Sequence, residues 1–350
     1  MPWESYYQLK GETKMKRKFN FIGILVIGLT MLLAACSGGG SEESNGSSDN
    51  SDGGKKAVDY PTKNIEVLVG HGAGGGTDLF ARAVTKELED ILGVNINVVN
   101  QEGGAGVIAA QNAFNAPADG YTLVGDAAFP ITTAAGTNEH GLDDFVPIAR
   151  FQADTYALWV DPKKYDSIEE FIQAAKDNPG KITVGGTGSM GMDEITVFQL
   201  SQAAEVELSF VPMQGSGEMH AGVIGGHLDA MVDEFGPTKA LYEDESIKPL
   251  VVFAEERLEQ FPELPTTVEN GWDLTDGNER GFYVKKGTDP EIIKLLEDAM
   301  KKAYDTEAYQ KFEEESYLHL REGWLNSEDF TKRTEELIEK YKVVMEELQK

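Results

Sequence analysis

Two glycine-rich segments are the parts of this sequence whose residue types and spacing best suit the binding of an anion. Residues 70–78 read GHGAGGGTD, and residues 185–192 read GGTGSMGM. Glycines let backbone N–H groups approach a ligand closely. The first turn of a helix adds unpaired N–H donors and the positive end of the helix dipole. A glycine-rich turn that leads into a helix therefore suits a carboxylate or a phosphate.

Each segment lies between an expected strand and an expected helix. The first follows a β-branched run at 65–70 and precedes a helix at 79–92, where apolar residues recur every four positions. The second follows a strand at 181–184 and precedes a helix at 193–204. Two helix N-termini that face each other across a cleft would hold opposite parts of one anion, so this repetition favours a binding site more than either segment alone.

Nucleotide binding fits the first segment poorly. Its glycines do not follow the GxGxxG spacing, and the acidic residue expected at the end of the second strand is Asn97 or Asn100. The lysine of a phosphate-binding P-loop is also missing. Thr77 is a candidate N-cap or hydroxyl donor, and a purely structural tight turn is the alternative that remains open.

Three single residues near these segments are further candidates. Asp233 ends an expected strand at 228–233, and it could accept from a ligand or cap the following segment through local N–H groups. His71 could donate to a ligand oxygen, more tightly when protonated, although a pocket-wall role is the simpler interpretation. Arg280 is a candidate partner of a carboxylate, with a surface ion pair as the simpler interpretation.

No catalytic or metal-binding pattern competes with anion binding. The histidines are scattered without metal-ligand spacing, and the chain has a single cysteine. Neither a GxSxG elbow nor a paired-acid motif rises above chance. We therefore expect a binding protein and not an enzyme, with no metal and no cofactor.

The N-terminus predicts export and a lipid anchor. Three basic residues follow Met15, the expected start in place of Met1, and precede an apolar run at 21–35. This run is shorter than the roughly 18 to 20 residues that span a bilayer. The LAAC at 33–36 resembles the lipobox of bacterial lipoproteins, which implies that Cys36 is lipidated. Residues 37–57 are rich in Gly, Ser and acids, as in a flexible tether.

Composition restricts the partners and the fold class. A formal net charge of −29 argues against nucleic acid and anionic lipid headgroups, and a bound anion must be held by local geometry. Short strands alternate with helices, which predicts an α/β fold with mostly parallel sheets and helices on both faces. The strands are expected at 65–70, 96–100, 122–126, 157–160, 182–185, 208–212, 228–233 and 250–253.

Several motifs, in order, resemble those of one family. They are YPTKNI at 60–65, GAGGGTD at 72–78, NQEGGAG at 100–106, ADGYTL at 118–123, VPMQG at 211–215, GGHLD at 225–229 and FPELPTTV at 261–268. The sequence resembles the substrate-binding proteins of tripartite tricarboxylate transporters, the Bordetella uptake gene family. The resemblance extends from residue 60 to near the C-terminus.

The resemblance implies a type II periplasmic-binding-protein fold, in which two α/β domains enclose a ligand cleft. Residues 1–35 would be an extension and signal peptide, and 36–57 the lipidated cysteine and linker. Domain 1 would comprise 58–157 and 284–350, and domain 2 would comprise 158–283. The implied ligand contacts are Gly74, Gly75, Gly76, Thr77 and Asp78 on one side and Gly188, Ser189 and Gly191 on the other, with His71 and Asp233 as added candidates.

The sequence departs from the family at both segments. An aromatic residue usually stands at the position of His71. The second segment usually continues with small polar residues and a histidine, where this chain has Met190, Met192, Asp193 and Glu194. These differences change the expected shape and charge of the pocket, so the ligand of a relative cannot simply be transferred.

The function that the resemblance implies is extracytoplasmic capture of a small organic carboxylate, with a di- or tricarboxylate favoured. The protein would deliver this ligand to the integral membrane subunits of a secondary transporter, as a monomer anchored to the membrane through Cys36. A lipoprotein sensor that presents its ligand to a signalling partner is an alternative, and an exported hydrolase is a weaker one.

Overall fold

The computed structural model describes residues 58–189, 191–275 and 277–348. The expected signal peptide, Cys36, the linker at 36–57 and Met190 lie outside these residues, so the predictions for them are not addressed by the fold. Among the described residues, none of the helices combines the length and apolar character needed to cross a membrane.

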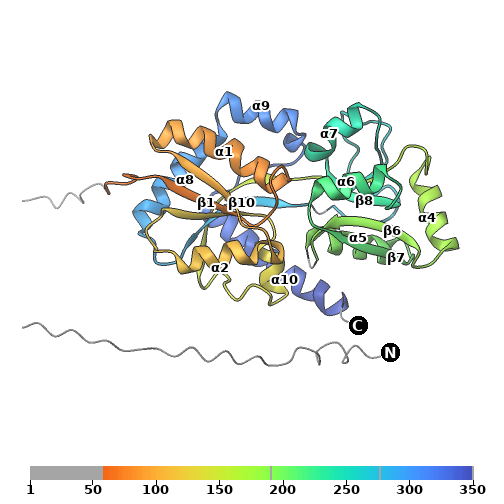
Figure 1. Cartoon of the computed structure of the whole chain (residues 1–350), viewed down its shortest axis with the longest axis horizontal. Coiled ribbons are helices and arrows are strands. Elements are labelled where there is room, and N and C mark those ends of the chain that lie inside the picture. The colour runs from red at the N-terminus through yellow and green to blue at the C-terminus, as the bar shows by residue number, and fades with distance from the viewer. Residues whose placement is uncertain (1–57, 190, 276, 349–350) are drawn as a thin grey trace, which may run out of the picture. The chain divides into compact units, whose positions relative to one another are not determined.

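The first lobe is built on a five-stranded sheet with the order β2-β1-β3-β10-β4. β1 runs parallel to β2 and β3, whereas β10 runs antiparallel to both of its neighbours. Figure 1 shows α1, α2, α8 and α9 around this sheet. The strands are β1 (Ile65–Val69), β2 (Ile96–Asn100), β3 (Thr122–Asp126), β4 (Phe145–Ala153) and β10 (Glu279–Lys285), and the helices are α1 (Gly76–Leu92), η2 (Gly104–Gly106), α2 (Val107–Asn115), α3 (Phe129–Ala134), α8 (Pro290–Tyr304), α9 (Glu307–Glu315) and η3 (Leu318–Leu320).

The second lobe has a sheet of the same design, in the order β7-β6-β8-β5-β9. β6 runs parallel to β7 and β8, and β5 runs antiparallel to β8 and β9. β6 therefore occupies the place that β1 has in the first sheet, and β8 occupies the place of β3. The strands are β5 (Tyr156–Val160), β6 (Ile182–Thr187), β7 (Leu208–Met213), β8 (Ala230–Glu234) and β9 (Lys248–Val252), and the helices are α4 (Ile168–Asp177), α5 (Met192–Ala203), α6 (Ser216–Ile224) and α7 (Phe235–Glu243).

This shared order puts the two glycine-rich segments at equivalent points. β1 leads into α1 and β6 leads into α5, and each of these strands lies between two parallel neighbours. In open α/β sheets, ligands bind outside the carboxyl ends of the strands, where the strand order reverses. The topology therefore predicts a ligand site at the carboxyl end of β1 in the first lobe and of β6 in the second.

The two-lobed α/β fold is confirmed, and all eight expected strands are present. Two strands were missed, β4 and β10. The expectation of mostly parallel sheets is right for the central strands and wrong for β10 and β5, which run against their neighbours.

The expected domain boundaries shift when strand pairing is considered. β5 already belongs to the second sheet from Tyr156, and β10 belongs to the first sheet from Glu279. The chain therefore crosses between the lobes at 154–155 and returns within 253–278. Residues 279–283, expected in domain 2, pair with β3 and β4 of the first lobe because β10 completes that sheet.

The C-terminal helix α10 (Ser327–Leu348) contacts both lobes. Phe330 packs with Tyr283 and Phe145 of the first lobe. Leu337 and Tyr341 belong instead to the apolar cluster of the second lobe. A helix expected wholly in domain 1 thus lies along both lobes.

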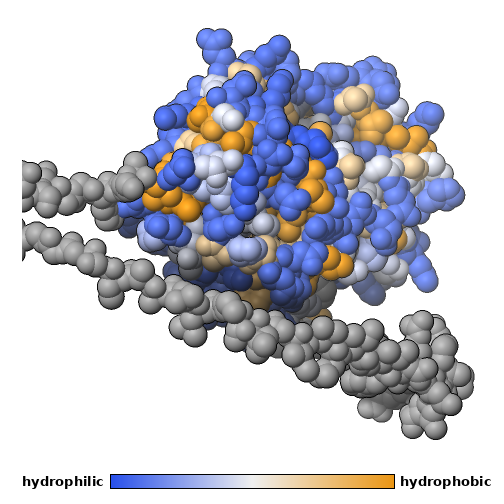
Figure 2. All heavy atoms as spheres, turned by 60° about the vertical axis from the view of Figure 1, so that its left-hand side comes forward, coloured by the Kyte–Doolittle hydropathy of each residue, from blue (hydrophilic) through white to orange (hydrophobic). Residues whose placement is uncertain are grey.

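The face of the first lobe that Figure 2 shows carries mostly hydrophilic residues. Figure 2 shows this lobe turned forward, with hydrophobic residues only in small, separate patches. The chain contains 60 acidic and 31 basic residues, which accounts for this polar surface.

Candidate functional site

The helices that follow the two glycine-rich segments begin without side-chain caps. Gly75 is the N-cap of α1 and Gly191 is the N-cap of α5, and neither end has a side-chain cap hydrogen bond. Ser167 caps α4, Asp289 caps α8 and Thr306 caps α9, whereas α2, α3, α6 and α7 also begin without a side-chain cap. The first-turn N–H groups of α1 and α5 therefore donate to no N-cap side chain.

The Asp78 side chain fixes the conformation of the first glycine-rich segment through hydrogen bonds. Its carboxylate accepts from the Gly74 N–H at 2.9 Å, from Arg82 Nε at 2.9 Å and from Asn100 Nδ2 at 2.9 Å. Although burial raises it, these hydrogen bonds hold the pKa of Asp78 below its ordinary value. Asp78 and the Gly74 N–H, both expected ligand contacts, thus already have partners within the first lobe.

The next three residues of this segment approach other parts of the molecule. A Cβ added at Gly76 would lie 2.3 Å from Arg280 Nη2, so only glycine fits there. A Cβ added at Gly75 would lie 3.7 Å from Ser216 Oγ at the start of α6. The segment therefore reaches the second lobe. Thr77 is buried, and its Oγ1 accepts a hydrogen bond from Arg280 Nε at 3.2 Å.

The second segment is held by a buried acid in a similar way. Asp193, in the first turn of α5, accepts from the Thr187 N–H at 2.7 Å, from Thr187 Oγ1 at 2.9 Å and from the Tyr156 hydroxyl at 2.5 Å. Burial raises the pKa of Asp193 despite these donors. Gly188 has a φ of 73°, in the left-handed region that favours glycine, and its N–H donates to the Met213 carbonyl at 2.8 Å.

Ser189 and Gly191 complete the second segment. Ser189 is exposed, whereas Gly191 is buried at the start of α5. Both expected contacts thus lie at the end of β6, the position that corresponds to the first segment.

Each lobe also places a buried aspartate beside a histidine. His71 Nε2 lies 3.1 Å from Asp126 Oδ1 at the end of β3, and His220 Nε2 lies 2.6 Å from Asp233 Oδ2 near the end of β8. Burial raises the pKa of Asp233 to about 7 and lowers the pKa of His220. The Glu234 N–H donates to Asp233 Oδ1 at 2.9 Å. This is the kind of local backbone bond expected if Asp233 caps the segment that follows it. A ligand contact by His71 or Asp233 stays a prediction.

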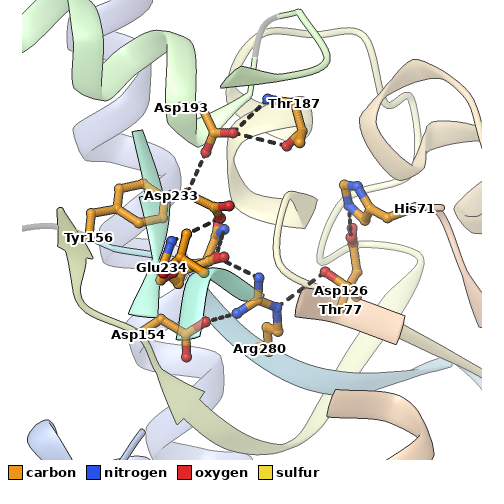
Figure 3. Close-up of polar contacts among 12 residues, drawn as sticks. His71, Thr77, Asp126, Asp154, Tyr156, Thr187, Asp193, Asp233, Glu234 and Arg280 are labelled. Atoms are coloured by element: carbon orange, nitrogen blue, oxygen red, sulfur yellow. Dashed lines mark hydrogen bonds and ion pairs between the residues drawn. The ribbon is translucent and has the colours of Figure 1, made fainter. Parts of the chain in front are cut away.

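Arg280 is not the surface ion pair that the simpler interpretation of the sequence expects. Only 3% of the residue is exposed. It forms ion pairs with Asp154 and with Glu234, whose Oε1 lies 2.7 Å from Nη2, in addition to its bond to Thr77. Figure 3 shows these partners converging on the guanidinium from different elements. Burial lowers the pKa of Arg280 to about 9, so it stays protonated at neutral pH.

Acidic groups outnumber basic ones in this region. The region contains Arg280 and His71 together with the carboxylates Asp126, Asp154, Asp193, Asp233 and Glu234 (Figure 3), and His220 lies beside Asp233. Burial and the neighbouring carboxylates raise the pKa of Glu234 well above its ordinary value. An anion bound here must therefore be held by N–H groups and helix dipoles, because the side-chain charges are mostly repulsive.

One defined groove of about 450 Å³ lies elsewhere in the second lobe. It is lined by the start of α4, part of β9, Tyr242 and residues 260–265, and by none of the glycine-rich segments. Among the described residues, no group of three or more histidine, cysteine, aspartate or glutamate side chains is arranged to hold a metal ion.

The sequence did not single out Asp126, Asp154, Tyr156, His220 or Glu234 as site residues. Asp126 is the last residue of an expected strand, and this position could have marked it as a candidate site residue. Asp154 lies in the crossing between the lobes and Tyr156 directly follows it, and no periodic pattern marks either residue.

Comparison with known proteins shows which family this chain belongs to. The model of the family described as "Tripartite tricarboxylate transporter family receptor" matches residues 80–349. The "UPF0065 protein in gbd 5'region" of Cupriavidus necator is 32% identical over 302 residues, which cover 84% of this chain and 90% of the relative.

Two solved structures show the same fold. One, described as a periplasmic transporter, has 26% identity and a TM-score of 0.76, and the match covers 82% of this chain and 97% of that chain. The other is MatC from Rhodopseudomonas palustris with bound malate. It has 23% identity and a TM-score of 0.74, with 81% of this chain and 99% of that chain covered.

Proposed function

Because this chain belongs to the tripartite tricarboxylate transporter receptor family, we propose that it captures a small organic carboxylate between its two lobes. It then delivers the carboxylate to the integral membrane subunits of a transporter of that type. The family consists of extracytoplasmic solute receptors and not of enzymes.

The observation that carries this proposal is the pair of uncapped helix N-termini. Gly75 and Gly191 are the N-caps of α1 and α5 at equivalent points of the two sheets, and no side chain caps either helix. Such ends offer N–H donors and a favourable dipole to a carboxylate. In a region where acids predominate, these donors are the main groups that can hold an anion.

The proposed contacts follow from which N–H groups are already used. Since the Gly74 N–H donates to Asp78 and the Gly75 N–H donates to the Gly72 carbonyl at 3.3 Å, the first segment would bind the ligand through the N–H groups of Gly76 and Thr77, with Gly75 beside them. The second segment would bind it through Ser189 and Gly191, while the Gly188 N–H is used by Met213. His71 and Asp233 would border the ligand.

A di- or tricarboxylate is the proposed ligand class. Two N-termini can each hold one carboxylate group, and MatC, a protein of the same fold, was solved with malate. We further propose that the protein is a monomer held at the membrane by a lipid on Cys36, which mass spectrometry of the mature protein tests.

Thr77→Pro tests the first N-terminus directly. Thr77 is the second residue of α1, where proline is tolerated but deletes an N–H donor. Loss of a hydrogen bond to a charged group costs about 1.5–3 kcal/mol, so affinity should fall by roughly 10- to 100-fold. The measurement is calorimetric titration with malate, citrate and adipate.

Two matched variants separate the N–H from other effects. Thr77→Val loses the same hydroxyl but keeps the N–H, so its affinity should stay clearly above that of Thr77→Pro. Glu169→Pro changes the second residue of α4, outside the site, and should leave binding unaltered. Equal affinity of Thr77→Pro and Thr77→Val for a carboxylate that binds would refute the proposed contact.

A further inference from the structure

Arg280 lies where the two chain crossings between the lobes run side by side. The Asp154 N–H, in the first crossing, donates to the Asn278 carbonyl in the second at 2.7 Å. A Cβ added at Gly277 would meet the Asp154 carbonyl oxygen at 1.9 Å, so the two crossings are in close contact. Arg280 follows two residues after Asn278, at the start of β10. It is therefore at the pivot about which the lobes could move.

The partners of Arg280 come from three parts of the molecule. Asp154 belongs to the first crossing, Glu234 ends β8 of the second lobe, and Thr77 belongs to the first turn of α1. The Asn278 side chain donates to the same Glu234 oxygen at 2.6 Å. A planar guanidinium with five fixed donors can bond all three partners together, which a lysine ammonium cannot do from one position.

We propose that Arg280 is a positioning residue that couples capture of a carboxylate at the start of α1 to closure of the two lobes, because it binds Thr77 of one lobe and Glu234 of the other. This inference rests on the proposed function for the identity of the ligand. The link between the lobes themselves stands on the contacts of Arg280.

The coupling follows from burial. With the lobes together, the guanidinium and the Glu234 carboxylate are almost fully removed from water, so each needs a hydrogen-bonded partner of opposite charge. Separation of the lobes would carry Glu234 away with β8 and return both groups to solvent. The bond from Nε to Thr77 means that the same side chain supports the first turn of α1, where the carboxylate is proposed to bind.

The experiment measures the distance between the lobes by double electron–electron resonance. Spin labels are placed at Lys86→Cys in α1 and Lys176→Cys in α4, two exposed positions in different lobes, in a full-length chain with Cys36→Ser. Distances are recorded with and without malate for the otherwise unchanged protein, for Arg280→Lys and for Glu234→Gln. Malate affinity is measured on the same samples, with adipate as the second probe.

Arg333→Lys is the matched control. Arg333 also pairs with a buried carboxylate, that of Glu279, but both residues belong to contacts of the first lobe. Arg280→Lys and Glu234→Gln should shift the distribution to longer distances, and Arg333→Lys should not. Glu234→Gln should add no further shift in the Arg280→Lys background, and Arg280→Lys should weaken malate or adipate binding at least tenfold.

The outcomes separate this inference from the proposed function. An unchanged distance distribution in Arg280→Lys, both with and without malate, overturns it, as does a longer distance with unaltered affinity. In a third outcome, the protein without the Arg280→Lys change binds neither malate nor adipate, while Arg280→Lys still lengthens the distance between the lobes. That result supports Arg280 as the link between the lobes and rejects the proposed ligand class.

Discussion

Two neighbouring residues of β10 form opposite kinds of buried ion cluster. Glu279 is one acid between two bases, with Arg150 Nη1 at 2.5 Å and Arg333 Nη2 at 2.6 Å. Arg280 is one base between two acids, Asp154 and Glu234. Successive side chains of a strand point to opposite faces, so the two clusters lie on different sides of the first sheet.

The two clusters differ in how well their charges are satisfied. Both carboxylate oxygens of Glu279 are bonded, and although burial opposes them, Arg333 and Arg150 hold its pKa below the ordinary value. Around Arg280, the Glu234 pKa is raised, and Asp154 Oδ1 is buried without a hydrogen-bond partner among the described residues. The Glu279 cluster is built to hold one lobe together, whereas the Arg280 cluster joins two lobes with less complete satisfaction.

The largest expected effect is that of Glu279→Gln. This change leaves Arg150 and Arg333 without their buried counter-charge, and the loss of one partner from such a pair typically costs about 3 kcal/mol or more. We expect the free energy of unfolding, measured by urea denaturation at neutral pH, to fall by that amount. A fall below about 1 kcal/mol would show that this cluster does not hold the lobe together.

Gly76→Ala should have an intermediate effect, because it disturbs the Arg280 cluster by crowding. The added methyl would lie 2.3 Å from Arg280 Nη2, and overpacking of this kind costs about 1–3 kcal/mol. Gly215→Ala is the control, since a Cβ there meets nothing within 4 Å and the backbone is extended. Equal unfolding free energies for the two variants would mean that Arg280 is not fixed against α1.

Glu234→Gln should have the smallest effect on unfolding, about 1 kcal/mol or less, because Asp154 still neutralises Arg280, glutamine keeps an oxygen that accepts from Arg280, and repulsion from Asp233 is relieved. The raised pKa of Glu234 determines how its contribution to the free energy of unfolding depends on pH. Between the ordinary value and the raised one, the folded state binds more protons than the unfolded state, so Glu234 lowers stability as pH rises.

The pH dependence sharpens the contrast between the two glutamates. Urea midpoints at pH 5 and pH 8 should show Glu234→Gln relatively more stable at pH 8. Glu279→Gln should be clearly destabilised at both values, since the stability from a lowered pKa is lost only as pH falls through the folded value. If the urea midpoints of both variants changed with pH in the same way, the two clusters would not differ as proposed.

Both strands that the sequence missed contain buried charged residues of these clusters. β4 reads FVPIARFQA and contains Pro147 and Arg150, and β10 begins with Glu279 and Arg280. Buried ionic residues interrupt the apolar pattern by which strands are recognised. A proline is tolerated in β4 because this strand lies at the edge of its sheet. The eight strands found from sequence have cleaner apolar patterns.

The sequence alone determined the features that depend on neighbouring residues. The strand, glycine-rich turn and helix units at 65–92 and 182–203 follow from local backbone preferences, as do the caps of Ser167 and Asp289. The N-cap of α1 was not predicted correctly, because Thr77 was the candidate and Gly75 has this position in the structure.

Only the tertiary structure decided which distant groups meet. The bond between Arg280 and Thr77 joins residues 203 positions apart, and the pairs His71–Asp126 and His220–Asp233 appear only when two sheets of the same order bring strand ends together. Long-range contacts depend on how strands pair and how lobes pack, and residue spacing along one chain does not encode these choices locally. The acidic character of the region between the lobes is therefore a property of the fold.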